Sequence, residues 1–353
     1  EDQAKDTNWL GQVEENFAKD HPEYNITWKN DVVSEGDASK QVSTDPSAAA
    51  DVYMFASDQL GVLMDAKAIG QLGTDAEKQV KEQNGDLEVD SVTGTDGKLY
   101  GVPYTDNTWF MYYNKSKITE DEAKDFDSIL AKAKVTFPMS NSWYVNGFYD
   151  GLSLFGEKGN DADAGMVFPK DGGDVTAYLA DVVANPNFSN DDGASGLAAI
   201  KDGSADVLFS GTWSAQDVKK ALGDNYAATS LPTFTVNGQK KQMKSFAATK
   251  AAAYNPNAKN PKAAAQFAAY LGSTEAQKLH YEMRAIPPTD KSLSDLTTDD
   301  IAAKAQADSM ANTALLQSGL SGMNDWWTPA ETFGKALVNK EITKDNAAAK
   351  YQD

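Results

Sequence analysis

Residue types suited to binding a carbohydrate occur directly after three predicted strands. A sugar ring has an apolar C–H face, against which tryptophan packs, and a rim of hydroxyl groups, which Asp, Asn and Gln bind through hydrogen bonds. In open α/β sheets, ligands bind at the carboxyl ends of strands. The residues that combine such a type with such a position are Asp58, Gln59, Asn141, Trp143 and Trp213.

The strands that position these residues are the short apolar runs 51–55, 135–139 and 206–210. Each is followed by a predicted helix, the second of them through residues 140–154, and strands that alternate with helices indicate an α/β fold. Asp58 could also cap the helix expected at 59–66, and a cap does not exclude a ligand contact. Trp143 and Tyr144 are adjacent and would face different directions on a helix, so at most one should be a core residue.

The stretch Leu99–Lys115 joins two aromatic runs through the polar triplet Thr105-Asp106-Asn107. Pro103 removes one ladder hydrogen bond, which favours an edge strand or a strand end. The stretch is either a β-hairpin with core aromatics or a hinge between two lobes. In the hinge, Asn107 and Trp109 would face whatever lies between the lobes.

Composition sets the class of protein. The 353 residues suit two domains, and the absence of cysteine rules out disulfides, thiolate metal sites and cysteine nucleophiles. A net charge of −20 argues against a nucleic acid partner, because phosphate contacts need clustered Lys and Arg. The chain has no apolar run long enough for a transmembrane helix and no signal peptide.

Other segments give weaker indications. A helix is expected over residues 3–20, a strand over 25–29, and helices near 298–317 and 328–338. An α/β lobe normally begins with a strand before its first helix, so the chain is expected to start just after that strand. The Gly/Asp-rich segment 156–174 only faintly resembles a calcium loop, because Gly172 stands where the last acidic ligand belongs, and no metal or cofactor is predicted.

Four stretches in the same order resemble the solute-binding proteins of carbohydrate ABC importers, particularly the maltose/maltodextrin-binding type. They are Ala50–Asp58, Gly97–Lys115, Ile200–Trp213 and Ala264–Pro287. The resemblance covers nearly the whole chain.

This resemblance implies a periplasmic-binding-protein-like fold of type II, with a ligand cleft between two α/β lobes and a hinge of three crossings. The crossings are expected near 105–109, 244–250 and 290–298. Lobe one would comprise residues 1–106 and 249–295, and lobe two residues 107–248 and 296–353. We expect Leu99–Pro103 in lobe one and Phe110–Asn114 in lobe two.

The resemblance also assigns site residues. Asp58 matches the family's sugar-binding acid, Trp213 matches its stacking tryptophan, and Trp326 or Trp327 matches a late tryptophan. Gln59 and Asn107 stand where maltodextrin binders often have Arg and Glu, which leaves the sugar open. The full set of expected ligand-binding residues is Asp2, Asp58, Gln59, Asn107, Trp109, Asn141, Trp143, Trp213, Arg284, Trp326 and Trp327.

Two alternatives compete with a maltodextrin-binding protein. The same fold could bind another oligosaccharide of xylo-, fructo- or galacto-type. A glycoside hydrolase would also combine tryptophans with a pair of carboxylates. Against the enzyme, the candidate site holds few acids among Asn, Gln and Trp, and the sequence has no nucleophile elbow, P-loop or HExxH motif.

The resemblance implies an oligosaccharide ligand, the permease subunits of an ABC importer as partners, and a monomer. It also implies a lipoprotein anchored on a Gram-positive cell surface, or alternatively a periplasmic protein.

Overall fold

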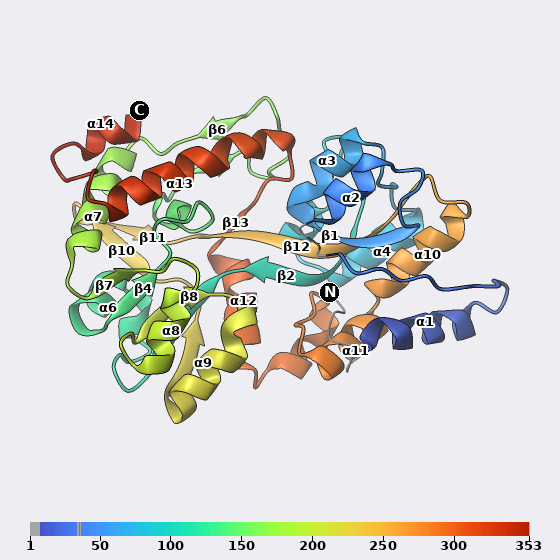
Figure 1. Cartoon of the computed structure of the whole chain (residues 1–353), viewed down its shortest axis with the longest axis horizontal. Coiled ribbons are helices and arrows are strands. Elements are labelled where there is room, and N and C mark those ends of the chain that lie inside the picture. The colour runs from blue at the N-terminus through green and yellow to red at the C-terminus, as the bar shows by residue number, and fades with distance from the viewer. Residues whose placement is uncertain (1–7, 34, 36, 353) are drawn as a thin grey trace.

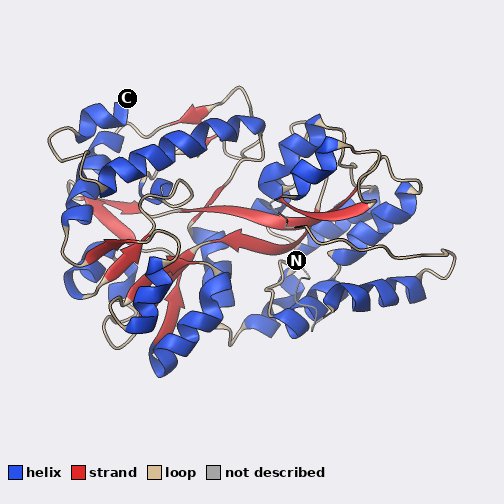
Figure 2. Ribbon diagram, viewed as in Figure 1, coloured by secondary structure: helices blue, strands red, loops and turns tan. Residues whose placement is uncertain are grey.

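The computed structural model describes residues 8–33, 35 and 37–352 and shows a mixed α/β protein with two lobes (Figures 1 and 2). Each lobe has its own β-sheet with helices packed around it, and two long strands run between the lobes. The predicted two-lobed α/β fold is therefore confirmed. No helix among the described residues is long and apolar enough to cross a membrane.

A four-stranded sheet, most of which lies in lobe one, is organised around one long strand, β12. Strand β12 pairs antiparallel with β1 and β2 and parallel with β13. Strand β2 pairs with residues 247–252 of β12, and this stretch overlaps the pairing of β1 and that of β13. Strands β1 and β13 therefore both lie on the other edge of β12. The four strands are β1 (Val52–Ala56), β2 (Val102–Thr108), β12 (Ser245–Tyr254) and β13 (Ala314–Leu316).

Both faces of this sheet are buried. Ala251 packs with Phe55 on one face, and Ala252 packs with Trp9 on the other, as the two-residue period of a strand requires. The helices of lobe one are α1 (Trp9–Asp20), α2 (Ala38–Thr44), α3 (Leu60–Asp65), α4 (Thr74–Gln83), α5 (Asp86–Ser91), α10 (Pro261–Leu271) and α11 (Thr274–Arg284).

Lobe two contains a five-stranded sheet in the order β7-β4-β8-β3-β9. Strand β4 is parallel to β7 and β8, whereas β3 is antiparallel to β8 and β9. The strands are β3 (Phe110–Asn114), β4 (Val135–Phe137), β7 (Phe188–Asn190), β8 (Val207–Ser210) and β9 (Tyr226–Thr229). Two small hairpins lie outside this sheet and consist of β5 (Ser153–Leu154) with β6 (Met166–Val167), and β10 (Thr233–Val236) with β11 (Gln239–Gln242).

The core of lobe two also follows strand alternation. Met111 and Tyr113 of β3 belong to one hydrophobic cluster, and Phe110 and Tyr112 belong to another. The helices of this lobe are α6 (Phe126–Lys132), α7 (Gly172–Ala184), α8 (Ser195–Asp202), α9 (Ala215–Leu222), α12 (Ile301–Asn312), α13 (Asn324–Val338) and α14 (Ala347–Gln352).

The polar triplet at residues 105–107 is part of a strand, because β2 continues through it to Thr108 and β3 begins at Phe110. Pro103 lies in this strand, which among the described residues pairs with β12 alone, and the register between the two strands shifts between Lys250 and Ala251. Strand β2 is thus an edge strand, as Pro103 predicted.

Three local predictions are wrong. Residues 25–29 form no strand, although Ile26 and Trp28 pack against the cluster of α1 and α10. A short 3₁₀ helix over residues 145–148 and turns replace the helix expected at 140–154. The helix expected near 298–317 ends at Asn312, and β13 follows it. In the last case, the pairing of β13 with β12 overrides the helical pattern of the segment.

Candidate ligand-binding site

The ends of two strands meet where the four-stranded sheet reaches the space between the lobes. Ala56 at the end of β1 lies opposite Lys250, and Leu316 at the end of β13 lies opposite Ala247. Because β1 and β13 run in opposite directions along one edge of β12, their carboxyl ends face each other across a gap of two residues. The chain segments that leave these ends therefore come together.

The residues that meet there are Asp58 and Gln317. The Gln317 side-chain Nε2 donates a hydrogen bond to Asp58 Oδ2 over 3.0 Å, and the Gln317 backbone N–H donates to the Ala247 carbonyl over 2.8 Å. Burial raises the pKa of the Asp58 carboxyl, and hydrogen bonds from its own backbone and from Gln317 act in the opposite direction. Asp58 thus offers an acceptor in a poorly hydrated position, where a hydrogen bond to a ligand hydroxyl is strong.

In lobe two, the parallel pairing of β4 and β8 places the segments after both strands at one edge of the sheet. Trp143 follows β4 and Trp213 follows β8, and their ring centroids lie 6.0 Å apart at an interplanar angle of 36°. The indole Nε1–H of Trp143 donates to Gln317 Oε1 over 2.7 Å. Gln317 therefore links the acid of lobe one to this aromatic pair of lobe two.

Trp213 is the most accessible member of the group, with 55% of its surface exposed. Its ring folds back over Gly211, where an added Cβ would lie 2.1 Å from the ring. The Gly211 carbonyl accepts a hydrogen bond from the Tyr112 hydroxyl over 2.8 Å, which fixes the turn. An exposed indole on a fixed turn is suited to stacking on a ligand.

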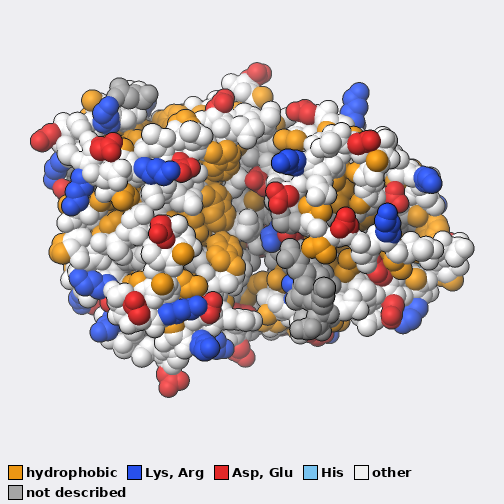
Figure 3. Space-filling model, viewed as in Figure 1, with side chains coloured by type: hydrophobic (Ala, Val, Ile, Leu, Met, Phe, Trp, Pro, Cys, Tyr) orange, Lys and Arg blue, Asp and Glu red, His pale blue; other side chains and the backbone are white. Residues whose placement is uncertain are grey.

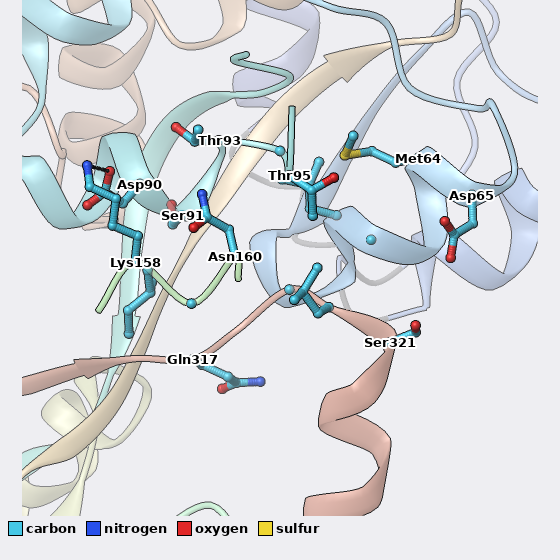
Figure 4. Close-up of a pocket in the computed structure, with 17 residues that line it drawn as sticks. Met64, Asp65, Asp90, Ser91, Thr93, Thr95, Lys158, Asn160, Gln317 and Ser321 are labelled. Atoms are coloured by element: carbon cyan, nitrogen blue, oxygen red, sulfur yellow. Dashed lines mark hydrogen bonds and ion pairs between the residues drawn. The ribbon is translucent and has the colours of Figure 1, made fainter. Parts of the chain in front are cut away.

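Figure 3 shows a groove between the lobes, with hydrophobic side chains along its lobe-two wall and charged side chains along its lobe-one wall. A cavity of about 120 Å³, lined in part by Gln317, lies between α3, the end of α5, residues 158–160 and residues 316–321 (Figure 4). The Lys158 ammonium and the Asp90 carboxylate form an ion pair of 3.0 Å beside this cavity. The cavity is much smaller than the roughly 300–1,000 Å³ of ordinary ligand pockets, so the open groove is the candidate site.

Sequence reasoning missed a polar cluster on lobe one. The Tyr104 hydroxyl donates to Glu35 Oε1 over 2.8 Å, and Lys250 Nζ lies 3.7 Å from Glu35 Oε2. Lys250 pairs with Thr105 in register, on the sheet face that also carries Asn107. A lysine within the small apolar run 246–254 is the signal that could have identified this cluster. Gln317 gave no such signal.

Four more of the expected ligand-binding residues fall into two pairs: Asn107 and Trp327 are half-buried, and Gln59 and Asn141 accept hydrogen bonds from backbone N–H groups. Asn107 is half-buried on β2, and Trp327 is half-buried and edge-on to Phe246. Gln59 Oε1 accepts from the Ser39 backbone N–H over 3.1 Å, so this side chain turns toward α2. Asn141 Oδ1 accepts from the Trp143 backbone N–H over 2.8 Å and shapes the turn that carries Trp143.

Two expected tryptophans, Trp109 and Trp326, are buried in the core of lobe two and have little surface to offer a ligand. Trp109 is fully buried because it continues the alternation of Met111 and Tyr113 into the lobe-two core, where it stacks on Tyr144. Trp326 is 8% exposed and donates from Nε1 to the Ser142 carbonyl.

Two expected residues remain, Arg284 and Asp2. Arg284 is half-buried at the end of α11, and the structure records no contact between it and Asp58, Trp143 or Trp213. Asp2 lies outside the described residues. The described residues contain no cluster of three or more His, Cys, Asp or Glu side chains placed to hold a metal ion.

The fold and the groove define a two-lobed solute-binding protein. A family model described as bacterial extracellular solute-binding protein matches residues 12–311, and the chain belongs to this family. It is therefore a binding protein and not an enzyme, and the resemblance found in the sequence is confirmed.

Individual relatives support this assignment. A protein solved with acarbose is 44% identical, with a TM-score of 0.89 over 98% of this chain and 92% of that one. The maltooligosaccharide ABC transporter solute-binding lipoprotein of Streptococcus pneumoniae is 28% identical over 74% of this chain and 67% of that protein. The galactooligosaccharide-binding protein of Bacillus subtilis is 27% identical over 86% of this chain and 76% of that protein.

Proposed function

We propose that this protein binds a maltooligosaccharide reversibly in the interlobe groove and delivers it to the permease of an ABC importer. The observation that carries the proposal is the pairing of an aromatic wall, the half-buried Trp143 and the exposed Trp213, with the half-buried carboxylate of Asp58 on the other lobe. Closure of the lobes would bring a sugar face against indole and its hydroxyls against carboxylate and amide. The relatives that bind maltooligosaccharide or were solved with acarbose support the same ligand class.

Asp58, Asn107, Trp143, Trp213 and Trp327 are the proposed ligand contacts from the expected set. Gln59 and Asn141 are proposed to support the site, since their side chains bind local backbone N–H groups. Glu35 and Lys250 extend the proposed polar wall of lobe one, because Lys250 lies opposite Ala56, two residues before Asp58, and its ammonium lies 3.7 Å from the Glu35 carboxylate.

We also propose the division into residues 1–106 with 249–295 and residues 107–248 with 296–353. It is supported by the course of the chain, because β2, β12 and the segment between α11 and α12 pass between the lobes (Figure 1). A monomeric lipoprotein on a Gram-positive surface is the proposed form, and the streptococcal lipoprotein supports the anchor. Light scattering and membrane fractionation test these two points.

A galacto-oligosaccharide is the second candidate ligand, since one relative is a galactooligosaccharide-binding protein. The neutral Asn107, where a carboxylate is common in maltodextrin binders, is the residue that keeps this alternative open.

Isothermal titration calorimetry with maltotriose, acarbose and matched galacto-, xylo- and fructo-oligosaccharides tests the proposal. We expect heat of binding with maltotriose and acarbose, and reducing-end analysis of the same samples should show no hydrolysis. Binding to the galacto-oligosaccharide alone would show that the ligand is a galacto-oligosaccharide and not a maltooligosaccharide. No heat with any sugar would refute oligosaccharide binding.

A further inference from the structure

One amide side chain connects the ligand-facing groups of the two lobes. Gln317 is 6% exposed, donates from Nε2 to Asp58 in lobe one and accepts at Oε1 from Trp143 in lobe two. Its backbone is fixed to the strand that crosses between the lobes, through the hydrogen bond to Ala247. A residue this buried has little surface for a ligand and acts mainly through its two partners.

The chemistry of the two partners fixes the orientation of the amide. The indole N–H only donates, and an ionised carboxylate only accepts, so a flipped amide would lose both hydrogen bonds. A carboxylate side chain at position 317 would face the Asp58 carboxylate, and an apolar one would leave a buried donor and a buried acceptor unpaired. Among common side chains of this length, glutamine alone satisfies both partners.

We propose that Gln317 is a positioning residue for oligosaccharide binding, whose amide holds the Asp58 carboxylate and the Trp143 indole in their binding orientations at the same time. This inference rests on the proposed function and deepens it. It explains how a carboxylate from one lobe and an indole from the other are already aligned before the ligand arrives. Pre-organisation of this kind lowers the entropy lost on binding.

The titration of Asp58 gives a readout that a purely structural role would not produce. Burial raises its pKa and Gln317 lowers it, and among the described residues no charged side chain contributes to the shift. Removal of the amide donor should therefore raise the pKa of Asp58 further. An introduced carboxyl group should instead share a proton with Asp58 when the pH falls.

The test compares Gln317→Met with Gln317→Glu in calorimetric titrations with maltotriose between about pH 5 and pH 8. For Gln317→Met we expect affinity at least roughly tenfold weaker at neutral pH, with a further loss as the pH falls. For Gln317→Glu we expect weak binding at neutral pH that improves as the pH falls. Gln242→Met is the matched control, because the side-chain Nε2 of Gln242 donates to the backbone carbonyls of residues 231, 232 and 243 in lobe two.

A second measurement needs no ligand and no variant that must fold. In the unmodified protein, the Trp143 indole N–H resonance should move with the titration of Asp58, because Gln317 connects the two groups. The inference would be overturned if both variants kept the maltotriose affinity and pH profile of the unmodified protein. It would also be overturned if the chemical shift of the Trp143 indole N–H did not change as Asp58 titrates. If the unmodified protein binds no sugar while its indole resonance follows Asp58, the proposed function fails, and the link between Asp58 and Trp143 through Gln317 stands without a role in oligosaccharide binding.

Discussion

The ring centroids of Trp143 and Trp213 lie 6.0 Å apart, although the two residues follow different strands of the lobe-two sheet. Trp213 is 55% exposed, so its ring contributes little to the core. Trp213→Ala should therefore weaken maltotriose binding at least roughly tenfold, the loss of one stacking surface, and leave the melting temperature nearly unchanged. Calorimetric titration and thermal unfolding measure the two effects.

Trp326→Ala is the control for Trp213→Ala, because it should lower stability where Trp213→Ala should lower affinity. Trp326 is 8% exposed in the lobe-two core, so its truncation should cost about 3–5 kcal/mol of unfolding free energy. An unchanged affinity in Trp213→Ala would assign Trp213 no part in ligand binding.

Gly211→Ala should weaken binding without removing any aromatic side chain. The added Cβ would lie 2.1 Å from the Trp213 ring, so the ring must leave its present position. We expect a several-fold loss of maltotriose affinity and a changed near-ultraviolet circular dichroism spectrum. Gly73→Ala is the matched control, because nothing lies within 4 Å of its added Cβ. Equal affinities for both variants would mean that the ring position is unimportant.

Asp58→Asn should reduce affinity by about 1.5–3 kcal/mol, the value of a hydrogen bond to a charged group, because the amide keeps the shape but loses the charge. Burial raises the pKa of Asp58, so the unmodified protein should bind sugar more weakly as the pH falls toward that raised value. The variant should lack this part of the pH dependence. Titrations at several pH values compare the two, and parallel profiles would exclude Asp58 as the ionised acceptor.

The strand ends that carry Asp58, Trp143 and Trp213 could be predicted from the sequence, because short apolar runs followed by polar residues are local signals, and the family resemblance implied the two lobes. The sequence could not predict the place of Gln317. That residue reaches Asp58 because β1 and β13, some 260 residues apart in the chain, end head to head on one edge of β12. Such a contact depends on sheet register, which no local pattern encodes.

Trp109 illustrates a different limit. Its side chain could point to the groove or to the core, and one residue of shift between β2 and β3 decides between them. The structure places Trp109 in phase with Met111, which directs it into the core of lobe two. A tryptophan beside a predicted hinge is therefore weak evidence for a ligand contact unless the strand register is known.

Asp106 should make the stability of the protein depend on pH. It lies on β2 opposite Thr249, whose hydroxyl is hydrogen-bonded to Ser91 of α5, so the carboxyl faces that helix. Among the described residues, Asp106 Oδ1 has neither solvent contact nor a hydrogen-bond partner. Burial, followed by the charge of Glu88, raises the pKa of Asp106 well above its usual value.

The sign of the effect follows from this raised pKa. The folded protein takes up a proton at Asp106 more readily than the unfolded chain, so the contribution to stability is largest below the ordinary carboxyl pKa of about 4. That contribution is lost as the pH rises through the raised value. Asp106→Asn removes the ionisable group and should unfold at a higher urea concentration than the unmodified protein at pH 7, and the difference should shrink toward pH 4. Asp51→Asn, at an exposed position of the same lobe, is the control and should show no such gain. An equal gain for Asp106→Asn at both pH values would show that repacking, and not ionisation, is its cause.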